Sequence, residues 1–217
     1  MPAEREATPL IEARGLTVRR AGRCVIDGLD LALHAGERLF VVGPSGVGKS
    51  TLLLTLLGFV PTDGGCISLL GRVCRREADF APLRGPIGLL FQDANDQLFG
   101  PTVLEDAEFG PLNQGLTAID ARMHAETALA AVGIPHLASR PVHDLSGGEQ
   151  RLAALAGVLA MHPSVLLLDE PTASLDAEAA TRVRDALAAT RLPMLVASHD
   201  AALIDALATR RVELGKR

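Results

Sequence analysis

Residues 38–51 read RLFVVGPSGVGKST, and this stretch decides the fold. The run RLFVV is typical of a strand buried in a parallel sheet, and the residues that follow, up to Leu57, favour a helix. Between them lies the pattern G-x-x-x-x-G-K-[ST], whose glycines let backbone N–H groups surround phosphates at a helix N-terminus. Lys49 then reaches the β- and γ-phosphates, and Ser50 offers a hydroxyl to Mg²⁺. We therefore predict a nucleoside triphosphate site composed of Gly43, Pro44, Ser45, Gly46, Val47, Gly48, Lys49, Ser50 and Thr51.

The basic residues of the chain support this assignment. Of 21 Lys and Arg residues, 19 are Arg, and Lys49 and Lys216 are the two lysines. A lysine retained inside such a composition indicates a position that needs a compact point charge on a thin stem, where a planar guanidinium would clash. The alternative, a glycine-rich turn with an incidental lysine, does not account for the flanking strand and helix.

A second strand ends in two acidic residues. SVLLLDE (164–170) is apolar up to Leu168 and closes with Asp169 and Glu170. An aspartate at the end of a buried strand beside a phosphate loop holds Mg²⁺, directly or through water. The following glutamate is placed to polarise a water for in-line attack on the γ-phosphate. Taken alone, the pair is equally consistent with an ordinary solvated turn.

A third element, LSGGEQ (145–150), opens a predicted helix. Ser146 and Glu149 fit the S-x-x-E capping box, and a well-capped helix is the simplest interpretation. Two glycines at the first helical positions lower helix stability, however, so we infer that bare backbone is required there. Free N–H groups at a helix N-terminus bind anions, which gives the chain two phosphate-binding helix starts about 100 residues apart.

The rest of the chain predicts an α/β protein. Its 217 residues, 48% of them hydrophobic, suit one domain or two intimately packed lobes. Strands alternate with helices, as in a mainly parallel sheet. The expected strands cover 10–34, 38–42, 66–70, 87–91, 164–170 and 193–199, and the expected helices cover 49–57, 117–132, 147–161 and 177–190.

Composition excludes several classes of protein. The net charge of −5 and the lack of Tyr and Trp argue against a nucleic-acid partner. The longest apolar stretch, 52–60, is far shorter than the roughly 20 residues that span a bilayer. Residues 1–9 have no apolar run of the secretory kind, so we expect a soluble intracellular chain. Cys24, Cys66 and Cys74 form no CxxC pair, and we interpret them as reduced, mostly buried thiols.

LSGGEQ, with the phosphate loop before it and LLLDEPTASLD (166–176) after it, resembles the signature of ABC-type ATPases, in the family order and over nearly the whole chain. The resemblance implies a P-loop α/β fold with a mainly parallel core sheet, an N-terminal antiparallel β subdomain and a helical lobe that carries the signature. The single domain would then divide into a nucleotide-binding core, 1–92 and 164–217, and a helical lobe, 93–163. In that family two subunits associate head to tail and sandwich two ATP molecules between them.

The same resemblance implies roles for individual residues. Gln92 matches the residue that touches Mg²⁺ and the attacking water. His199 matches the switch histidine that holds the γ-phosphate and orients Glu170, although an isolated histidine at a strand end is ordinarily a satisfied surface residue. Asp176 matches the loop that crosses the dimer interface. The signature residues that would contact the nucleotide of the partner subunit are Ser146, Gly147, Gly148 and Gln150.

One departure concerns the base. Members of the family usually stack adenine on an aromatic residue in the N-terminal strands, whereas the matching stretch here is Leu16-Thr17-Val18-Arg19-Arg20. The guanidinium of Arg20 can stack on a base. It can equally be a solvated charge at a strand edge, and the sequence leaves both interpretations open.

Two segments, 88–113 and 156–176, resemble the energy-coupling-factor ATPases, especially the cobalt/nickel branch, in which FQ-x-x-x-DQLF-x-x-TV-x-x-D-x-x-FGP-x-N recurs. The resemblance implies uptake of a metal ion or a vitamin, with the ATPase on the cytoplasmic face of the membrane. Its partners would be a membrane T protein with Arg-bearing cytoplasmic helices and a substrate-capturing S protein. Between Arg84 and Arg122 the chain has six acidic and no basic residues, as expected of a surface that receives such a helix. A solvated acidic face is the alternative.

An alternative to the importer is an ABC ATPase of another class. A membrane-associated ABC ATPase that transports nothing, such as a mechanical or cell-division switch, has the same core motifs. A DNA-repair or ribosome-acting ATPase needs a long insertion or a second ATPase domain.

Because 18 residues follow His199, where the cobalt/nickel branch often carries an extension, we expect a dimer that depends on ATP, a homodimer or one with a similar ATPase. The six histidines lack ligand spacing, so we expect no transported metal to bind this subunit.

Overall fold

The computed structural model describes residues 8–215. Most of the segment 1–9, on which the expectation about a secretory signal rests, and Lys216 lie outside the described residues. The strands are β1 (Ile11–Arg20), β2 (Arg23–Leu33), β3 (Arg38–Val42), β4 (Gly64–Leu69), β5 (Arg72–Cys74), β6 (Ile87–Leu90), β7 (Val165–Asp169), β8 (Met194–Ala197) and β9 (Arg210–Glu213). The α-helices are α1 (Lys49–Leu56), α2 (Glu77–Phe80), α3 (Val103–Asn113), α4 (Ala118–Ala131), α5 (Gly147–Ala160), α6 (Ala177–Ala189) and α7 (Ala201–Leu207).

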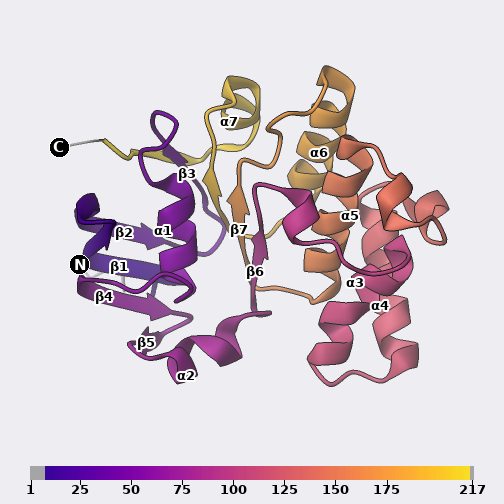
Figure 1. The fold of residues 1–217 in the computed structure, drawn as a ribbon, viewed down its shortest axis with the longest axis horizontal. Coiled ribbons are helices and arrows are strands. Elements are labelled where there is room, and N and C mark those ends of the chain that lie inside the picture. The colour runs from indigo at the N-terminus through magenta and orange to yellow at the C-terminus, as the bar shows by residue number, and fades with distance from the viewer. Residues whose placement is uncertain (1–7, 216–217) are drawn as a thin grey trace, which may run out of the picture.

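Two sheets organise the molecule. Five strands form a parallel sheet in the order β6-β7-β8-β3-β9, and four form an antiparallel sheet in the order β2-β1-β4-β5. Helix α1 lies between the two sheets, and α3 to α6 lie on the opposite side of the parallel sheet (Figure 1). The predicted parallel core with an N-terminal antiparallel sheet and a helical lobe is therefore confirmed.

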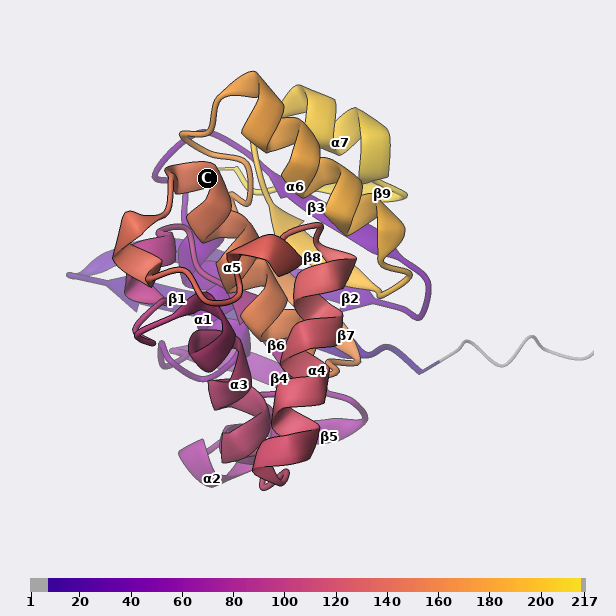
Figure 2. The same ribbon diagram turned by 90° about the vertical axis from the view of Figure 1, so that its right-hand side faces the viewer.

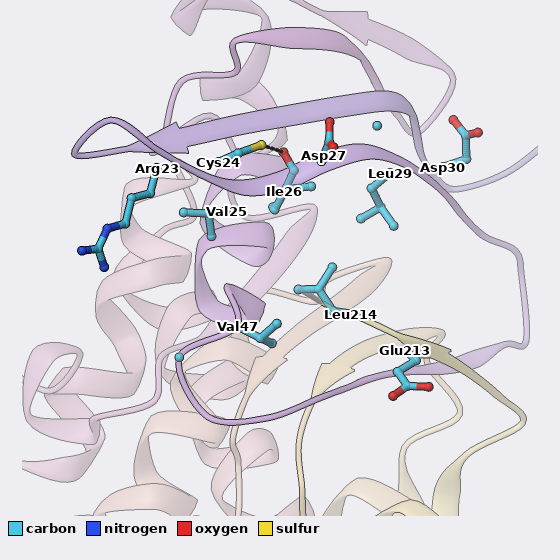
Figure 3. A pocket seen from close by; sticks show the side chains of 13 residues that line it. Arg23, Cys24, Val25, Ile26, Asp27, Leu29, Asp30, Val47, Glu213 and Leu214 are labelled. Carbon is cyan, nitrogen blue, oxygen red and sulfur yellow. Dashed lines mark hydrogen bonds between the residues drawn. The ribbon is translucent and has the colours of Figure 1, made fainter. Parts of the chain in front are cut away.

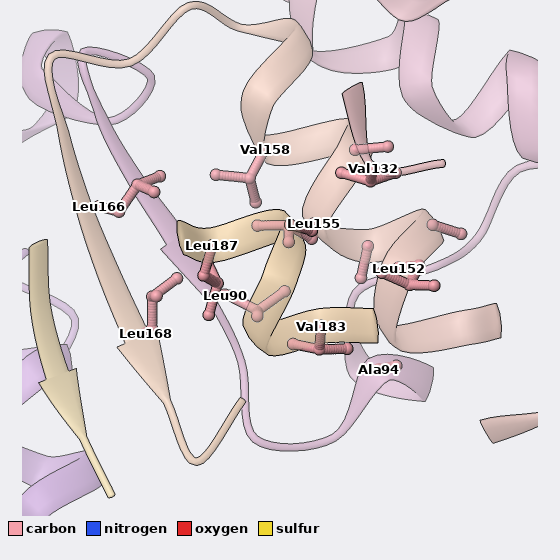
Figure 4. Packing of buried hydrophobic residues seen from close by; sticks show 14 of the residues in the cluster. Leu90, Ala94, Val132, Leu152, Leu155, Val158, Leu166, Leu168, Val183 and Leu187 are labelled. Atoms are coloured by element: carbon pink, nitrogen blue, oxygen red, sulfur yellow. The ribbon is translucent and has the colours of Figure 1, made fainter. Parts of the chain in front are cut away.

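The apolar runs form strands because both faces of the parallel sheet are buried. Along β7, Leu166 and Leu168 face one hydrophobic cluster, while Val165 and Leu167 face the other. Figure 4 shows the first pair directed toward side chains of α5 and α6. The second cluster joins the sheet to α1 and to the antiparallel strands. Burial on both faces fixes the strand ends, which carry the functional residues, relative to the rest of the molecule.

Helices α3, α4 and α5 pack against one another to form a helical lobe (Figure 2). The sequence predicted the second and third of these helices but not α3, which contains Pro111. The helix forms because Thr102 caps it, accepting a hydrogen bond from the N–H of Glu105. The small elements α2, α7, β5 and β9 were likewise not predicted. The division of the chain at residues 93 and 163 stays a prediction.

The expectation that the cysteines are mostly buried is wrong. Cys74 is buried, but Cys24 and Cys66 are exposed. Cys66 precedes the buried Ile67 on β4, so the alternation of side chains along the strand places its thiol on the solvent side. Cys24 lies near the start of β2, where the pairing with β1 shifts register between Val18 and Arg19, and both Arg23 and Cys24 are exposed there. Among residues 8–215, no helix combines the length and the apolar character that crossing a bilayer requires.

Candidate functional site

The phosphate loop connects β3 to α1, as predicted. Gly48 precedes the helix in a left-handed conformation with φ of 113°, and α1 begins at Lys49. The ammonium of Lys49 is buried and donates to the carbonyl oxygens of Gly43 and Pro44, at 3.0 and 3.4 Å. The loop backbone thus encloses the one cation that the motif provides, at the positive end of the helix dipole.

Close contacts explain two glycines of this loop. A Cβ atom on Gly48 would overlap a methyl group of Val25 on β2, and one on Gly43 would overlap the carbonyl oxygen of Leu214. Both glycines also have positive φ. The loop is therefore confined between the antiparallel sheet and the segment that follows β9, so that its N–H groups keep a defined arrangement.

Glu170 follows β7 and lies at the centre of the site. Its Oε1 atom is 3.4 Å from Nζ of Lys49 and 2.9 Å from Nδ1 of His199. The Oε2 atom accepts a hydrogen bond from the N–H of His199, at 3.3 Å. Glu170 is 7% exposed and has φ of 43°, a left-handed conformation that is unfavourable for a residue with a Cβ atom. The imidazole of His199 is largely exposed, so it can face a ligand while it contacts the carboxylate.

Asp169 is the last residue of β7 and is 7% exposed. Burial raises the pKa of its carboxyl, and the neighbouring Glu170 adds to this, whereas Ser50 and Lys49 act in the opposite direction. Within the described part of the chain, its Oδ1 atom has no hydrogen-bond partner. A buried carboxylate oxygen without a partner, beside the Ser50 hydroxyl, is a donor set that fits Mg²⁺. The residues present are therefore suited to this metal.

A cavity of about 480 Å³ brings several predicted residues together. Ser50, Gln92 and Asp169 line it, and so do Gly147 and Gln150 from the start of α5. Gln92 itself is exposed and follows the end of β6. The glutamine, the metal-suited carboxylate and the signature segment therefore border one cavity.

The signature segment begins α5 with the predicted capping box. Ser146 accepts a hydrogen bond from the N–H of Glu149, whose carboxylate accepts one from the N–H of Ser146 at 2.8 Å. The inference that both glycines provide bare backbone is only half supported. A Cβ atom on Gly148 would lie 2.5 Å from that of Ala179 on α6, whereas Gly147 faces open space. Gly148 is thus explained by helix packing, and Gly147 is the accessible position.

Glu149 brings a negative charge to this helix start. Hydrogen bonds from the Ser146 N–H and hydroxyl hold the pKa of its carboxyl below the ordinary range, and Arg140 and Arg182 assist. Nη1 of Arg140 is 3.2 Å from Oε1 of Glu149. The positive charges of Arg140 and Arg182 offset the negative charge of the Glu149 carboxylate, so the start of α5 can still bind an anion.

Asp176 and Arg20 are among the predicted residues that do not line this cavity. Asp176 is exposed and caps α6, accepting a hydrogen bond from the N–H of Ala179 at 2.8 Å. Arg20 is exposed at the end of β1, opposite Arg23 across the hairpin. A cavity of about 680 Å³ lies between β2, the phosphate loop and the segment after β9, with Arg23 rather than Arg20 at its edge (Figure 3). The residues that line this cavity belong to the described part of the chain, and none of them is aromatic.

Sequence reasoning missed three polar residues around the site. Arg151 is 5% exposed and donates to the carbonyl oxygens of Phe91 and Gln92. Thr172 donates its hydroxyl to Asp200, which caps α7. The sequence signal for Arg151 was the presence of a charged residue on the apolar face of a predicted helix. Asp200 directly before an apolar helical run was the signal for a cap.

The sequence and the fold are similar to those of known proteins. Residues 26–173 match the family model described as ABC transporter. A Haemophilus influenzae protein named as an uncharacterized ABC transporter ATP-binding protein is 50% identical over 212 residues, covering 98% of each chain. The cobalt import ATP-binding protein CbiO of Rhodobacter capsulatus is 45% identical over 208 residues, covering 94% of this chain and 74% of that one. The structure of cbiO1 from Clostridium perfringens, described as part of the ABC transporter complex cbiONQ, has a TM-score of 0.79 and 33% identity, covering 88% of this chain and 79% of that one.

The phosphate loop between β3 and α1, with the acidic end of β7 beside it, defines a P-loop ATPase. The chain belongs to the ABC transporter family, in which it is an ATP-binding, ATP-hydrolysing subunit.

Proposed function

We propose that ATP hydrolysis takes place at the loop between β3 and α1 with Glu170 as the general base. In this proposal Lys49 and the N–H groups from Gly43 to Thr51 hold the phosphates, His199 contacts the γ-phosphate, and Gln92 orients the attacking water. The contacts of Glu170 with Lys49 and His199 support these roles, because they bring base and phosphate-binding groups within hydrogen-bond reach.

Mg²⁺ would be held by Ser50, Asp169 and Gln92 together with the phosphates. When bound, the metal would neutralise negative charge on the phosphate oxygens. The unpartnered Oδ1 of Asp169 supports this assignment, because a bound cation would remove the cost of that buried oxygen. Burial raises the pKa of Asp169 despite the opposing effects of Ser50 and Lys49, so a bound cation would favour the ionised carboxylate against the cost of burial.

The signature segment would act on the nucleotide of a second subunit in an ATP-dependent dimer, either a homodimer or a pair with a similar ATPase. Ser146, Gly147, Gly148 and Gln150 would contact that nucleotide, and Asp176 would lie at the interface. The open space at Gly147 and the exposure of Asp176 support contacts with a partner, while Gly148 would contribute its N–H only. For the base, Arg20 and Arg23 at the hairpin between β1 and β2 are the candidate stacking groups.

The role in the cell that these features support best is that of an energy-coupling-factor importer, powering uptake of a metal ion or vitamin from the cytoplasmic face of the membrane. One groove carries this proposal. It is about 350 Å³ in volume and lies where β6 meets the helical lobe. Its aromatic lining residues are Phe59, Phe91, Phe99 and Phe109.

The groove has the chemistry that an amphipathic helix with arginines requires. Phe99 and Phe109 contact each other edge to face, 4.4 Å between ring centroids, and both are about half exposed or more. Asp93, Asp96 and Glu105 lie exposed on the adjoining segment. Apolar side chains of a T-protein helix would enter between the rings, and its arginines would meet the acidic residues. The name of the Rhodobacter relative, a cobalt import protein, favours a metal ion as cargo.

Affinity purification of the tagged chain from solubilised membranes tests this function. We expect a small polytopic protein with Arg-bearing cytoplasmic helices, and a second membrane protein whose ligand identifies the cargo. Recovery of a division-type membrane protein, or of no membrane protein at all, would reject the importer and favour an ABC ATPase that transports nothing. ATPase activity measured on the same preparation tests ATP hydrolysis independently of the role as an importer.

A further inference from the structure

Arg151 is a buried charge without an acidic partner among its hydrogen bonds. It is the fifth residue of α5 and is 5% exposed. Nη1 donates to the carbonyl oxygen of Phe91 at 2.6 Å, and Nη2 donates to that of Gln92. Its Nε atom has no partner within residues 8–215. Burying an arginine costs free energy. The hydrogen bonds that Arg151 donates to two consecutive backbone carbonyls therefore need a functional explanation.

The segment held by Arg151 is attached on its other side to the core sheet. The Oε1 atom of Gln97 accepts from the N–H of Phe91 at 3.0 Å, and its Nε2 donates to the carbonyl oxygen of Leu89 at 3.3 Å. Leu89 belongs to β6 of the parallel sheet. Phe91 and Gln92 thus lie at a junction between the core, through Gln97, and the helical lobe, through Arg151.

The charge of Arg151 interacts with that of Asp169, the carboxylate suited to Mg²⁺. Desolvation lowers the pKa of Arg151, and the charges of Asp93 and Asp169 counteract it. Arg151, Gln92 and Asp169 line the same cavity of about 480 Å³. A guanidinium can meet two adjacent carbonyls with a rigid fork, which an ammonium cannot do.

We infer that Arg151 is a positioning residue that couples the signature helix α5 to Gln92. Its guanidinium holds the Phe91 and Gln92 carbonyls, so the Gln92 side chain follows α5, five residues beyond the Ser146 cap, when the helical lobe moves relative to the sheet. The helix is rigid over this distance, about 7.5 Å at 1.5 Å per residue. Contact of a second subunit with the signature segment would therefore adjust the glutamine at the metal and water. This inference rests on the role proposed for Gln92.

The test compares Arg151→Met with Gln92→Ala and with the double variant in the full-length chain. We expect Arg151→Met to lower kcat of ATP hydrolysis about 10- to 100-fold, with KM for MgATP changed less than about threefold. Because Arg151 acts through Gln92, the double variant should be no slower than Gln92→Ala within about twofold. Arg151→Lys, which keeps the charge and one hydrogen bond, should recover part of the rate.

Two further measurements exclude a merely structural effect. Leu152→Ala removes a buried neighbour on the same helix and leaves the carbonyl contacts in place, so it should lower Tm with kcat unchanged. Hydrogen exchange of a peptide containing Gln92 and Asp93 should accelerate in Arg151→Met and not in Leu152→Ala. If Arg151→Met does not fold, Arg151→Lys is tested in the same scheme.

The outcomes distinguish the inference from the proposed function beneath it. If Gln92→Ala leaves kcat unchanged, the role proposed for Gln92 is wrong, and the inference is lost with it. If Gln92→Ala lowers kcat but Arg151→Met does not, or if the two losses multiply in the double variant, the coupling through Arg151 is rejected while the role of Gln92 stands.

Discussion

The ammonium of Lys49 lies 3.4 Å from Oε1 of Glu170, the same oxygen that is 2.9 Å from Nδ1 of His199. One carboxylate oxygen therefore contacts the first residue of α1, at the end of the phosphate loop, and the segment after β8. A γ-phosphate attracted to Lys49 and His199 would compete for both partners of this oxygen and leave it available to a water. In the proposed mechanism, arrival of the substrate thus frees the base.

Glu170→Gln tests this role directly. The amide keeps the size of the side chain but cannot accept a proton, so we expect ATP hydrolysis to fall about 10²- to 10⁴-fold. ATP binding should persist, and the variant should accumulate as an ATP-dependent dimer on size-exclusion chromatography. A rate near that of the wild type would remove Glu170 from the role of base.

Lys49→Ala should affect an earlier step. Loss of a buried cation that contacts phosphates predicts ATP affinity about 10- to 100-fold weaker by titration calorimetry, together with loss of hydrolysis. Lys49→Arg serves as the matched control for charge. Because Nζ lies among the carbonyls of Gly43 and Pro44, the planar guanidinium should not fit, and this variant should fail as well. Normal ATP binding by Lys49→Ala would contradict the phosphate-site assignment, whereas normal binding by Lys49→Arg would show that the loop accepts a guanidinium.

The backbone of Glu170 predicts a conflict between stability and function. Its φ of 43° is costly for a residue with a Cβ atom and acceptable for glycine. Glu170→Gly and Glu170→Ala both remove the carboxylate, so their difference isolates the backbone. We expect the glycine variant to be more stable by about 1 kcal/mol, or about 2–4 °C in Tm, with both inactive. Equal melting temperatures of the glycine and alanine variants would show that the backbone at residue 170 relaxes and relieves the strain.

Asp169 and Asp200 should change stability with pH in opposite directions. Burial raises the pKa of Asp169 in the folded state above its ordinary value of 3.8, so its ionised form destabilises the fold at neutral pH. That penalty disappears as the pH falls through the raised pKa toward 3.8. Asp169→Asn should therefore be more stable than wild type near pH 7, and the advantage should vanish in acid, as followed by thermal melts across pH.

Asp200 provides the control of opposite sign. Burial alone would raise its pKa, but the hydrogen bond from Thr172 and those from the N–H groups of Leu203 and Ala202 lower it below 3.8. Its ionised form therefore contributes stability above pH 3.8 that is lost as the pH falls through the lowered pKa. Asp200→Asn should melt below wild type near pH 7 and converge with it in acid. The same trend in both variants would contradict the assignment of burial as the dominant cause at Asp169.

Local signals in the sequence were sufficient to predict the loop at 43–51, the strand before it and the acidic end of β7. Each depends on residues adjacent in the chain: an apolar run, glycines at fixed offsets and two carboxylates at a strand end. Helix α3 escaped prediction because Gly110 and Pro111 lower its propensity, and packing against α4 and α5 compensates.

Long-range contacts were the second limit. Arg151 meets carbonyls about 60 positions earlier in the chain, and Gly148 is explained by Ala179 on a different helix. Neither relation has a local pattern, since nothing in the residues next to Arg151 specifies what its guanidinium will contact. The exposure of Cys24 and Cys66 was misjudged for a similar reason, because burial on an antiparallel strand depends on register.

The groove between β6 and the helical lobe gives the last prediction. Phe109 is 46% exposed at its edge, so Phe109→Ser should remove apolar surface that a partner helix needs while Tm changes little. We expect recovery of the membrane partner in affinity purification to fall about tenfold, consistent with loss of an aromatic anchor. Ile119→Ser is the matched control, since Ile119 is 82% exposed on α4 and lies outside the groove lining. Equal losses in the two variants would indicate a general effect of surface polarity on the lobe, and no loss in either would reject the groove as the docking site.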